Sequence, residues 1–192
     1  MSALNYSFTW LKQMSLGSWQ VEPIVGSYPQ KVATAIGNLG EELLGAVYEP
    51  IAYLGSQTAN GINHAVLAKQ TIVAGIDHTN IVILKFNEKG MDCSLYAVEP
   101  VMQGGSAFGG YTIDPKVGKD IPAEDLETFH SVTEGWLGND IEVIAKLASK
   151  VVKGIDLVFL AKVTGVYPDA QPNATLIVLN GLTRTLDFVD IL

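Results

Sequence analysis

The sequence predicts an α+β fold made of two tandem copies of one unit, each a twisted antiparallel sheet wrapped on one α-helix. Three observations predict it: an internal repeat covering most of the chain, one amphipathic helical stripe in each copy, and four β-rich runs after each stripe. The 192 residues are 48% apolar and 17% charged, a composition that can bury a core.

The repeat appears when the chain is aligned with itself at an offset of 93 residues. Over positions 41–69 the two copies share 13 of 29 residues, whereas chance would give about two. Upstream, at an offset of 92, residues 17–23 align with residues 109–115, and both segments read Gly, small, aromatic, polar, β-branched, acid, Pro. The sequence is therefore a duplication.

This duplication predicts four segments. They are an N-terminal arm (1–16), a first repeat (17–100), a linker (101–108) and a second repeat (109–192). The glycine-rich stretch from Gln103 to Phe108 is typical of a short flexible connection. Each repeat is small, so contact between the two repeats would add stability.

Each repeat opens with a short strand, predicted at 19–22 in the first copy and ended by Pro23. A helix follows and begins near Pro29, because proline suits a first helical turn. Apolar residues then recur at helical spacing. This stripe consists of Val32, Ile36, Leu39, Leu43 and Val47 in the first copy and of Leu126, Phe129, Val132, Trp136 and Leu137 in the second.

Four β-rich runs follow each predicted helix. We expect strands at 48–57, 62–73, 80–87 and 91–99 in the first repeat, and at 141–150, 155–164, 174–180 and 183–191 in the second. Tight turns are marked by Gly61, Lys89-Gly90, Gly154 and Asn180-Gly181. Short turns join antiparallel neighbours, and one helix can cover one face of such a sheet.

Charge and composition exclude several classes of protein. The formal net charge is −8, which argues against a nucleic-acid binder and against binding to anionic membranes. The chain shows neither a signal peptide nor an apolar run long enough to span a bilayer, so we expect a cytoplasmic protein. The single cysteine, Cys93, has no partner for an internal disulfide and is interpreted as a small strand residue.

The predicted layout, with a glutamine-to-glycine turn after the second strand, resembles the cystatin family, including bacterial cystatin-like repeats. Cystatins carry Gln-x-Val-x-Gly in the first hairpin loop, often followed by Asn and an aromatic residue. Here Gln57-Thr58-Ala59-Asn60-Gly61 keeps Gln and Gly, and Asn63-His64 follows. In the second repeat, Lys150-Val151-Val152-Lys153-Gly154 keeps Val152 and Gly154 but has Lys150 in place of Gln.

The resemblance implies reversible inhibition of papain-like cysteine proteases by a three-part wedge that fills the protease cleft. The parts would be Leu16-Gly17, the loop from Gln57 to Gly61, and a second hairpin at Glu88-Lys89-Gly90. The corresponding hairpin of the second repeat is Asn180-Gly181-Leu182. Neither hairpin contains the Pro-Trp pair of the family. We expect the loss of this aromatic anchor to weaken protease binding by about 2 kcal/mol or more, so inhibition would be weaker than in the family.

Other interpretations remain open. The loop 57–61 is also compatible with a plain turn, and the loop 150–154 is interpreted as a structural turn. The alternative is that the chain is a non-inhibitory, cystatin-like module for protein binding or assembly. His64, His78 and His130 have no recognisable nucleophile partner and no zinc-ligand spacing. We therefore predict no catalytic residue, cofactor or metal, and a protein as the partner.

Overall fold

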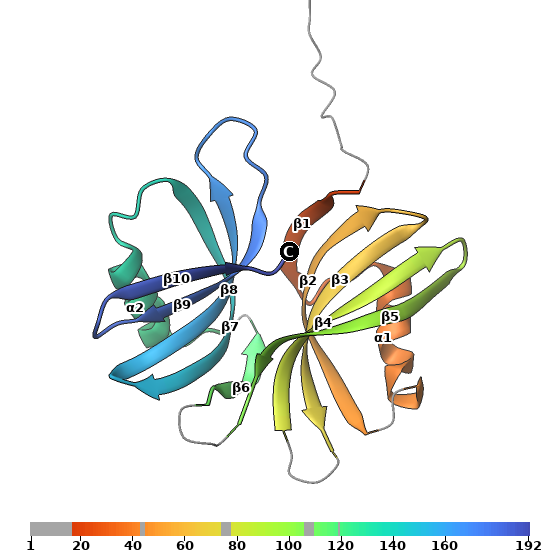
Figure 1. The fold of residues 1–192 in the computed structure, drawn as a ribbon, viewed down its shortest axis with the longest axis horizontal. Helices are drawn as coiled ribbons and strands as arrows, with labels where there is room; N and C mark the ends of the chain where they lie inside the picture. Colours follow the sequence, from red (N-terminus) through yellow and green to blue (C-terminus); the bar gives the residue numbers. More distant parts are fainter. Residues whose placement is uncertain (1–16, 43–44, 74–77, 106–109, 119) are drawn as a thin grey trace, which may run out of the picture.

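A computed structural model describes residues 17–42, 45–73, 78–105, 110–118 and 120–192 (Figure 1). The described residues form ten strands and two helices, arranged as two five-stranded antiparallel sheets. The predicted arm, residues 1–16, lies outside them, and so does Leu16 of the predicted wedge.

Each sheet is an antiparallel meander whose first two strands are connected through a helix. The first sheet has the order β1 (Trp19–Val25), β2 (Ala46–Thr58), β3 (Ile62–Ile72), β4 (His78–Lys89) and β5 (Asp92–Gln103), with α1 (Gln30–Glu42) between β1 and β2. The second sheet contains β6 (Thr112–Gly118), β7 (Asn139–Val152), β8 (Gly154–Gly165), β9 (Asn173–Asn180) and β10 (Thr185–Asp190), with α2 (Ala123–Thr133) between β6 and β7.

The predicted α+β class is wrong, because the chain is mostly β. The helices are shorter than their apolar stripes suggest. Helix α1 ends at Glu42, Gly45 takes a φ of 96°, and Val47 pairs with Thr71 in the sheet. In the second repeat α2 ends at Thr133, before Trp136 and Leu137. The strands that follow the helices are longer than predicted, 46–58 instead of 48–57 and 139–152 instead of 141–150, whereas the last strand is shorter, 185–190 instead of 183–191.

The two sheets pack face to face and share one core. Alternate residues of the central strands point to opposite faces: Ala65 and Leu67 of β3 enter the shared core, whereas Val66 packs on the α1 side. The shared core also takes side chains from the second sheet, including Leu147 and Leu160. Because both faces of β3 and β8 are buried at their middle, residues 65–68 and 157–161 are continuously apolar rather than alternating.

The helices cover the outer faces of the two sheets and lie on opposite sides of the molecule (Figure 1). Val32 and Leu39 of α1 pack with Leu84 and Phe86 of the first sheet. In the second sheet, Phe129 of α2 packs edge-on against Phe159, with 5.4 Å between ring centroids. The layers are therefore helix, sheet, sheet and helix.

Part of the predicted linker belongs to the folded core. Residues 101–103 form the end of β5, and Gly104 donates a backbone hydrogen bond to Thr79. Gly104 also bridges to Tyr111, and a Cβ atom on Gly104 would lie 2.2 Å from the Thr79 carbonyl oxygen. The connection is closely packed at Gly104, and Gly105 donates a backbone hydrogen bond to the Tyr111 carbonyl oxygen; residues 106–109 lie outside the described residues.

Candidate functional site

The structure brings the described parts of the predicted wedge together at one end of the first sheet. The loop 57–61 joins β2 to β3, and the hairpin 88–92 joins β4 to β5. Ile62 is paired with Glu88, so the two tips are neighbours. Trp19 is paired with Gln57, which places Gly17 beside the first tip. We call this end, made of Gly17 and these two hairpins, the wedge end.

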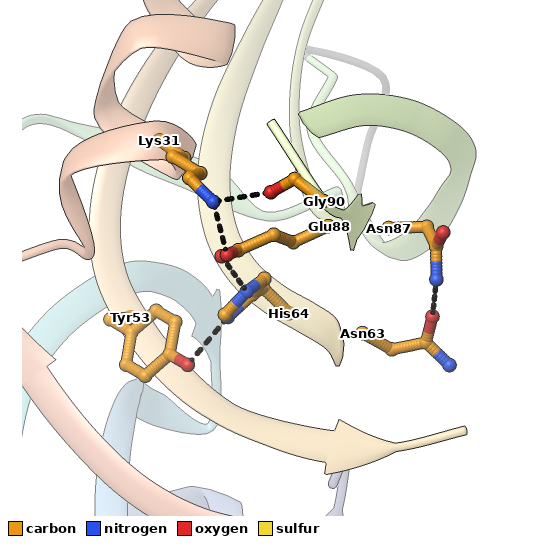
Figure 2. Close-up of polar contacts among 7 residues, drawn as sticks. All are labelled: Lys31, Tyr53, Asn63, His64, Asn87, Glu88 and Gly90. Carbon is orange, nitrogen blue, oxygen red and sulfur yellow. Dashed lines mark hydrogen bonds and ion pairs between the residues drawn. The ribbon is translucent and has the colours of Figure 1, made fainter. Parts of the chain in front are cut away.

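A ladder of amide side chains crosses one face of the sheet beneath the tips. Gln57 donates from Nε2 to the Gly17 carbonyl oxygen and accepts at Oε1 from Asn63 Nδ2, with 3.0 Å between the donor and acceptor atoms. Asn63 accepts in turn from Asn87 Nδ2 at 2.7 Å, as Figure 2 shows. The ladder therefore fixes the start of β1 to the bases of both hairpins.

A second polar chain lies on the opposite face, under α1 (Figure 2). The Lys31 ammonium bonds both Glu88 Oε1, at 2.7 Å, and the Gly90 carbonyl oxygen, at 2.6 Å. The other Glu88 oxygen is 3.2 Å from His64 Nε2, and His64 Nδ1 is 2.9 Å from the Tyr53 hydroxyl. These contacts attach the first turn of α1 to the tip of the β4–β5 hairpin.

Chemistry settles the direction of these hydrogen bonds when His64 is neutral. An ionised carboxylate only accepts, so Nε2 carries the proton and donates to Glu88, and the Tyr53 hydroxyl donates to Nδ1. Burial lowers the pKa of the His64 imidazole below 6.5, and Glu88 opposes that shift. The hydrogen bond from Lys31 is the main reason that the pKa of the Glu88 carboxyl lies below 4.5.

His64 is expected to make the protein less stable in mild acid. Its pKa is lower folded than unfolded, so the unfolded chain binds more protons and stability falls as pH drops below about 6.5. Glu88 adds to this loss only below about 4.5. Urea unfolding should show that the free energy of unfolding of the wild type decreases between about pH 7.5 and about pH 5.5. The decrease should be smaller for His64→Gln, whose side chain keeps a donor and an acceptor but does not titrate. His78→Gln, at an exposed position, is the control; an equal decrease in both variants would contradict the assignment.

The wedge end is exposed and its tips are mainly polar. Thr58, Ala59 and Asn60 are exposed, and Asn60 and Gly61 take positive φ values of 44° and 114°. At the second tip, Lys89 is exposed and Met91 is 89% exposed. Met91 is therefore an exposed apolar side chain at the tip of the second predicted hairpin.

The second repeat has the same two hairpins with different chemistry. Lys150, Val151 and Val152 form the end of β7, with Lys153 and Gly154 at the turn. The Lys150 ammonium lies 5.3 Å from the centroid of the Tyr111 ring. Asn180, which is buried, donates to Asp156 and accepts from the backbone N–H groups of Leu182 and Thr183. The second repeat thus has its own set of polar contacts.

The other singled-out residues lie apart from one another. His78 begins β4, His130 lies exposed on α2, and Cys93 is half-buried beside the α1 core. In the part of the chain that the structure describes, no three His, Cys, Asp or Glu side chains are grouped so that they could hold a metal ion. The absence of a catalytic residue, metal and cofactor stays a prediction.

Sequence reasoning did not identify four residues that shape the wedge end: Lys31, Tyr53, Asn87 and Met91. Lys31 lies 57 positions before its partner Glu88, and only the packing of α1 on the sheet brings them together. Asn63 and Asn87 become partners through the β3–β4 register. The sequence signal for Met91 was an apolar residue placed directly after the predicted turn at Lys89-Gly90.

Comparisons of this chain with protein-family models, with curated proteins and with solved structures found no match. The described helices include none that is long and apolar enough to cross a membrane.

Proposed function

We propose that this chain is a cystatin-like protein whose wedge end binds another protein, and that its partner is a papain-like cysteine protease held reversibly through the loop 57–61. The observation that carries the proposal is the meeting of Gly17, that loop and the 88–92 hairpin at one exposed end of the sheet. Three segments that are far apart in the sequence thus lie side by side at one exposed edge, as binding in a cleft would require.

The two polar chains favour binding by a pre-formed edge. The amide ladder holds Gly17 against the first hairpin, and Lys31 holds the second hairpin through Glu88 and Gly90. Groups already fixed before binding lose little conformational entropy on association. The polar tips and the lack of the Pro-Trp pair favour an affinity below that typical of the family.

The test is a titration of papain activity with the full chain. We expect inhibition at micromolar concentrations and at least a tenfold loss in Ala59→Glu, because a carboxylate at the exposed tip would be desolvated in the cleft. Val152→Glu is the matched control, since Val152 occupies the equivalent position in the second repeat and should leave inhibition unchanged.

The alternative function is a non-inhibitory module for binding or assembly. It is supported by the exposed Met91, which can anchor many partners because its side chain is flexible. No inhibition at about 100 μM, which corresponds to binding weaker than about −5.5 kcal/mol, would contradict the protease proposal for papain. The non-inhibitory module would then be the better description.

A further inference from the structure

The sequence contains the dipeptide Asn-Gly twice, at Asn60-Gly61 and at Asn180-Gly181. The two copies lie in contrasting environments. Asn60 is exposed at the tip of the loop 57–61, whereas Asn180, at the end of β9, is only 1% exposed. The chain therefore contains an internal comparison for any reaction to which this dipeptide is prone.

Asn-Gly is prone to one spontaneous reaction, in which the backbone nitrogen of the glycine attacks the side-chain amide of the asparagine. The deprotonated nitrogen forms a bond to Cγ, the bond from Cγ to Nδ2 breaks, and the leaving group departs as ammonia. Water then opens the resulting succinimide ring at either carbonyl carbon. The product is aspartate, or isoaspartate, in which the main chain continues through the side-chain carbon. Glycine favours the attack because it has no Cβ atom to hinder it.

At Asn60 the two reacting groups are not engaged elsewhere. Within the described residues, neither the Asn60 side chain nor the Gly61 N–H has a hydrogen-bond partner. Beyond the strands that flank it, the loop is closed by a hydrogen bond from the Ala59 N–H to the Gly61 carbonyl oxygen, at 3.1 Å. Few contacts therefore have to break before the Gly61 nitrogen can approach Cγ of Asn60.

At Asn180 the same side chain is fixed by four hydrogen bonds. Nδ2, which would leave as ammonia, donates to the Asp156 carboxylate at 2.8 Å and to the Lys153 carbonyl oxygen at 3.3 Å. Oδ1 accepts from the backbone N–H groups of Leu182 and Thr183, both at 3.0 Å. Turning this side chain toward the next backbone nitrogen would break these bonds in a buried site, where unpaired polar groups are costly.

We propose that Asn60 is a site of spontaneous deamidation, which replaces the neutral amide at the tip of the first hairpin with an aspartyl or isoaspartyl carboxylate. Asn180 keeps its amide because its contacts protect it. The reaction adds one negative charge to a chain whose formal net charge is already −8. Hydroxide generates the attacking nitrogen anion, so the rate of deamidation rises with pH.

Deamidation changes the loop that the proposed function uses. A carboxylate at the tip would lose its water in a protease cleft, which is costly. An isoaspartyl link also lengthens the main chain beside Gly61, where an added Cβ atom would lie 2.4 Å from the Glu88 carbonyl oxygen. We therefore expect the wedge end to lose papain inhibition as the protein ages. This consequence rests on the proposed function, whereas the deamidation itself does not.

The experiment is peptide mapping of the full chain by mass spectrometry during incubation in mildly alkaline buffer at physiological temperature. The peptide that contains Asn60 should gain the mass difference between an amide and a carboxylic acid, in an aspartyl and an isoaspartyl form. The peptide that contains Asn180 should gain it at least about tenfold more slowly. In concentrated urea, which removes the fold, both peptides should deamidate at similar rates.

Asn60→Gly is the matched variant for the effect on inhibition, because glycine adopts a positive φ readily and carries no amide. Each protein is compared with its own fresh sample. The wild type should lose papain inhibition in proportion to its deamidated fraction, whereas Asn60→Gly should keep the inhibition that it had when fresh. If the fresh wild type does not inhibit papain, the proposed function fails, and peptide mapping still tests the deamidation site.

Two outcomes would overturn the proposal. One is an Asn60 amide that stays intact in the folded chain for the time in which both peptides react in urea. The other is deamidation of Asn180 as fast as that of Asn60 in the folded chain. Deamidation of Asn60 with unchanged papain inhibition would contradict the consequence for the wedge end.

Discussion

Replacing Leu160 with alanine is expected to lower the free energy of unfolding by about 3 kcal/mol and to weaken the first sheet as well as the second. Leu160 belongs to β8, is completely buried and faces the core between the sheets. That core also contains Leu54 and Leu67 of the first sheet. Removing the Leu160 side chain leaves a cavity that both sheets line, so its cost cannot be confined to one repeat.

The measurement is native-state hydrogen exchange of the amides of β3 and β8 at low urea. In Leu160→Ala both strands should lose protection by a similar free energy, although β3 carries no substitution. Leu182→Ala removes the same atoms from an exposed position and should cost less than about 0.5 kcal/mol. Loss of protection in β8 alone would show that the two repeats unfold independently.

This shared core explains why the predicted fold class failed although the order of elements was predicted well. The repeat, the helix after the first strand and the hairpin turns were visible in the sequence. The runs Ala65 to Ala68, Ile81 to Leu84 and Val158 to Ala161 are apolar at every position. Such runs indicate burial on both faces of a strand. Here one face is covered by a helix and the other by the second sheet. Weighing them would have predicted stacked sheets.

The helix ends could not be predicted from the apolar stripe alone. Val47 continues the 3.6-residue spacing of α1, yet it lies 51% exposed in β2. Gly45, at a φ of 96°, ends the helical path and starts the strand. Periodicity fixes which face of an element is apolar, but a glycine at a positive φ decides where the element stops.

At the wedge end, the turns could be predicted from the sequence, whereas the side-chain contacts between residues far apart in the chain could not. The loop 57–61 and the hairpin 88–90 follow from turn residues that are close in sequence. The contacts of Lys31 with Glu88, and of Gln57 with Asn63 and Asn87, depend on helix packing and strand register. The sequence therefore identified the tips, whereas the structure identified the side chains that hold them.

Gly61 lies where the two hairpins of the wedge end approach each other most closely, with no room for a Cβ atom. Gly61→Ala is therefore expected to lower the free energy of unfolding by about 3 kcal/mol. Gly61 has a φ of 114°, which L side chains rarely adopt, and an added Cβ would lie 2.4 Å from the Glu88 carbonyl oxygen. That oxygen belongs to the backbone of β4, so the clash can be relieved only by moving the two hairpins apart. Glu88 would then shift away from Lys31 and His64.

Gly90→Ala is the matched substitution, because Gly90 also has a positive φ, 61°, but an added Cβ would meet nothing within 4 Å. It should cost only about 1 kcal/mol, the strain of the left-handed conformation itself. Urea unfolding gives both costs, and hydrogen exchange at Ile62 and Glu88 shows whether the hairpins have separated. Equal costs would mean that backbone strain alone matters at Gly61. A larger cost for Gly61→Ala, with loss of papain inhibition in the folded variant, would show that the close approach of the two tips is needed for binding.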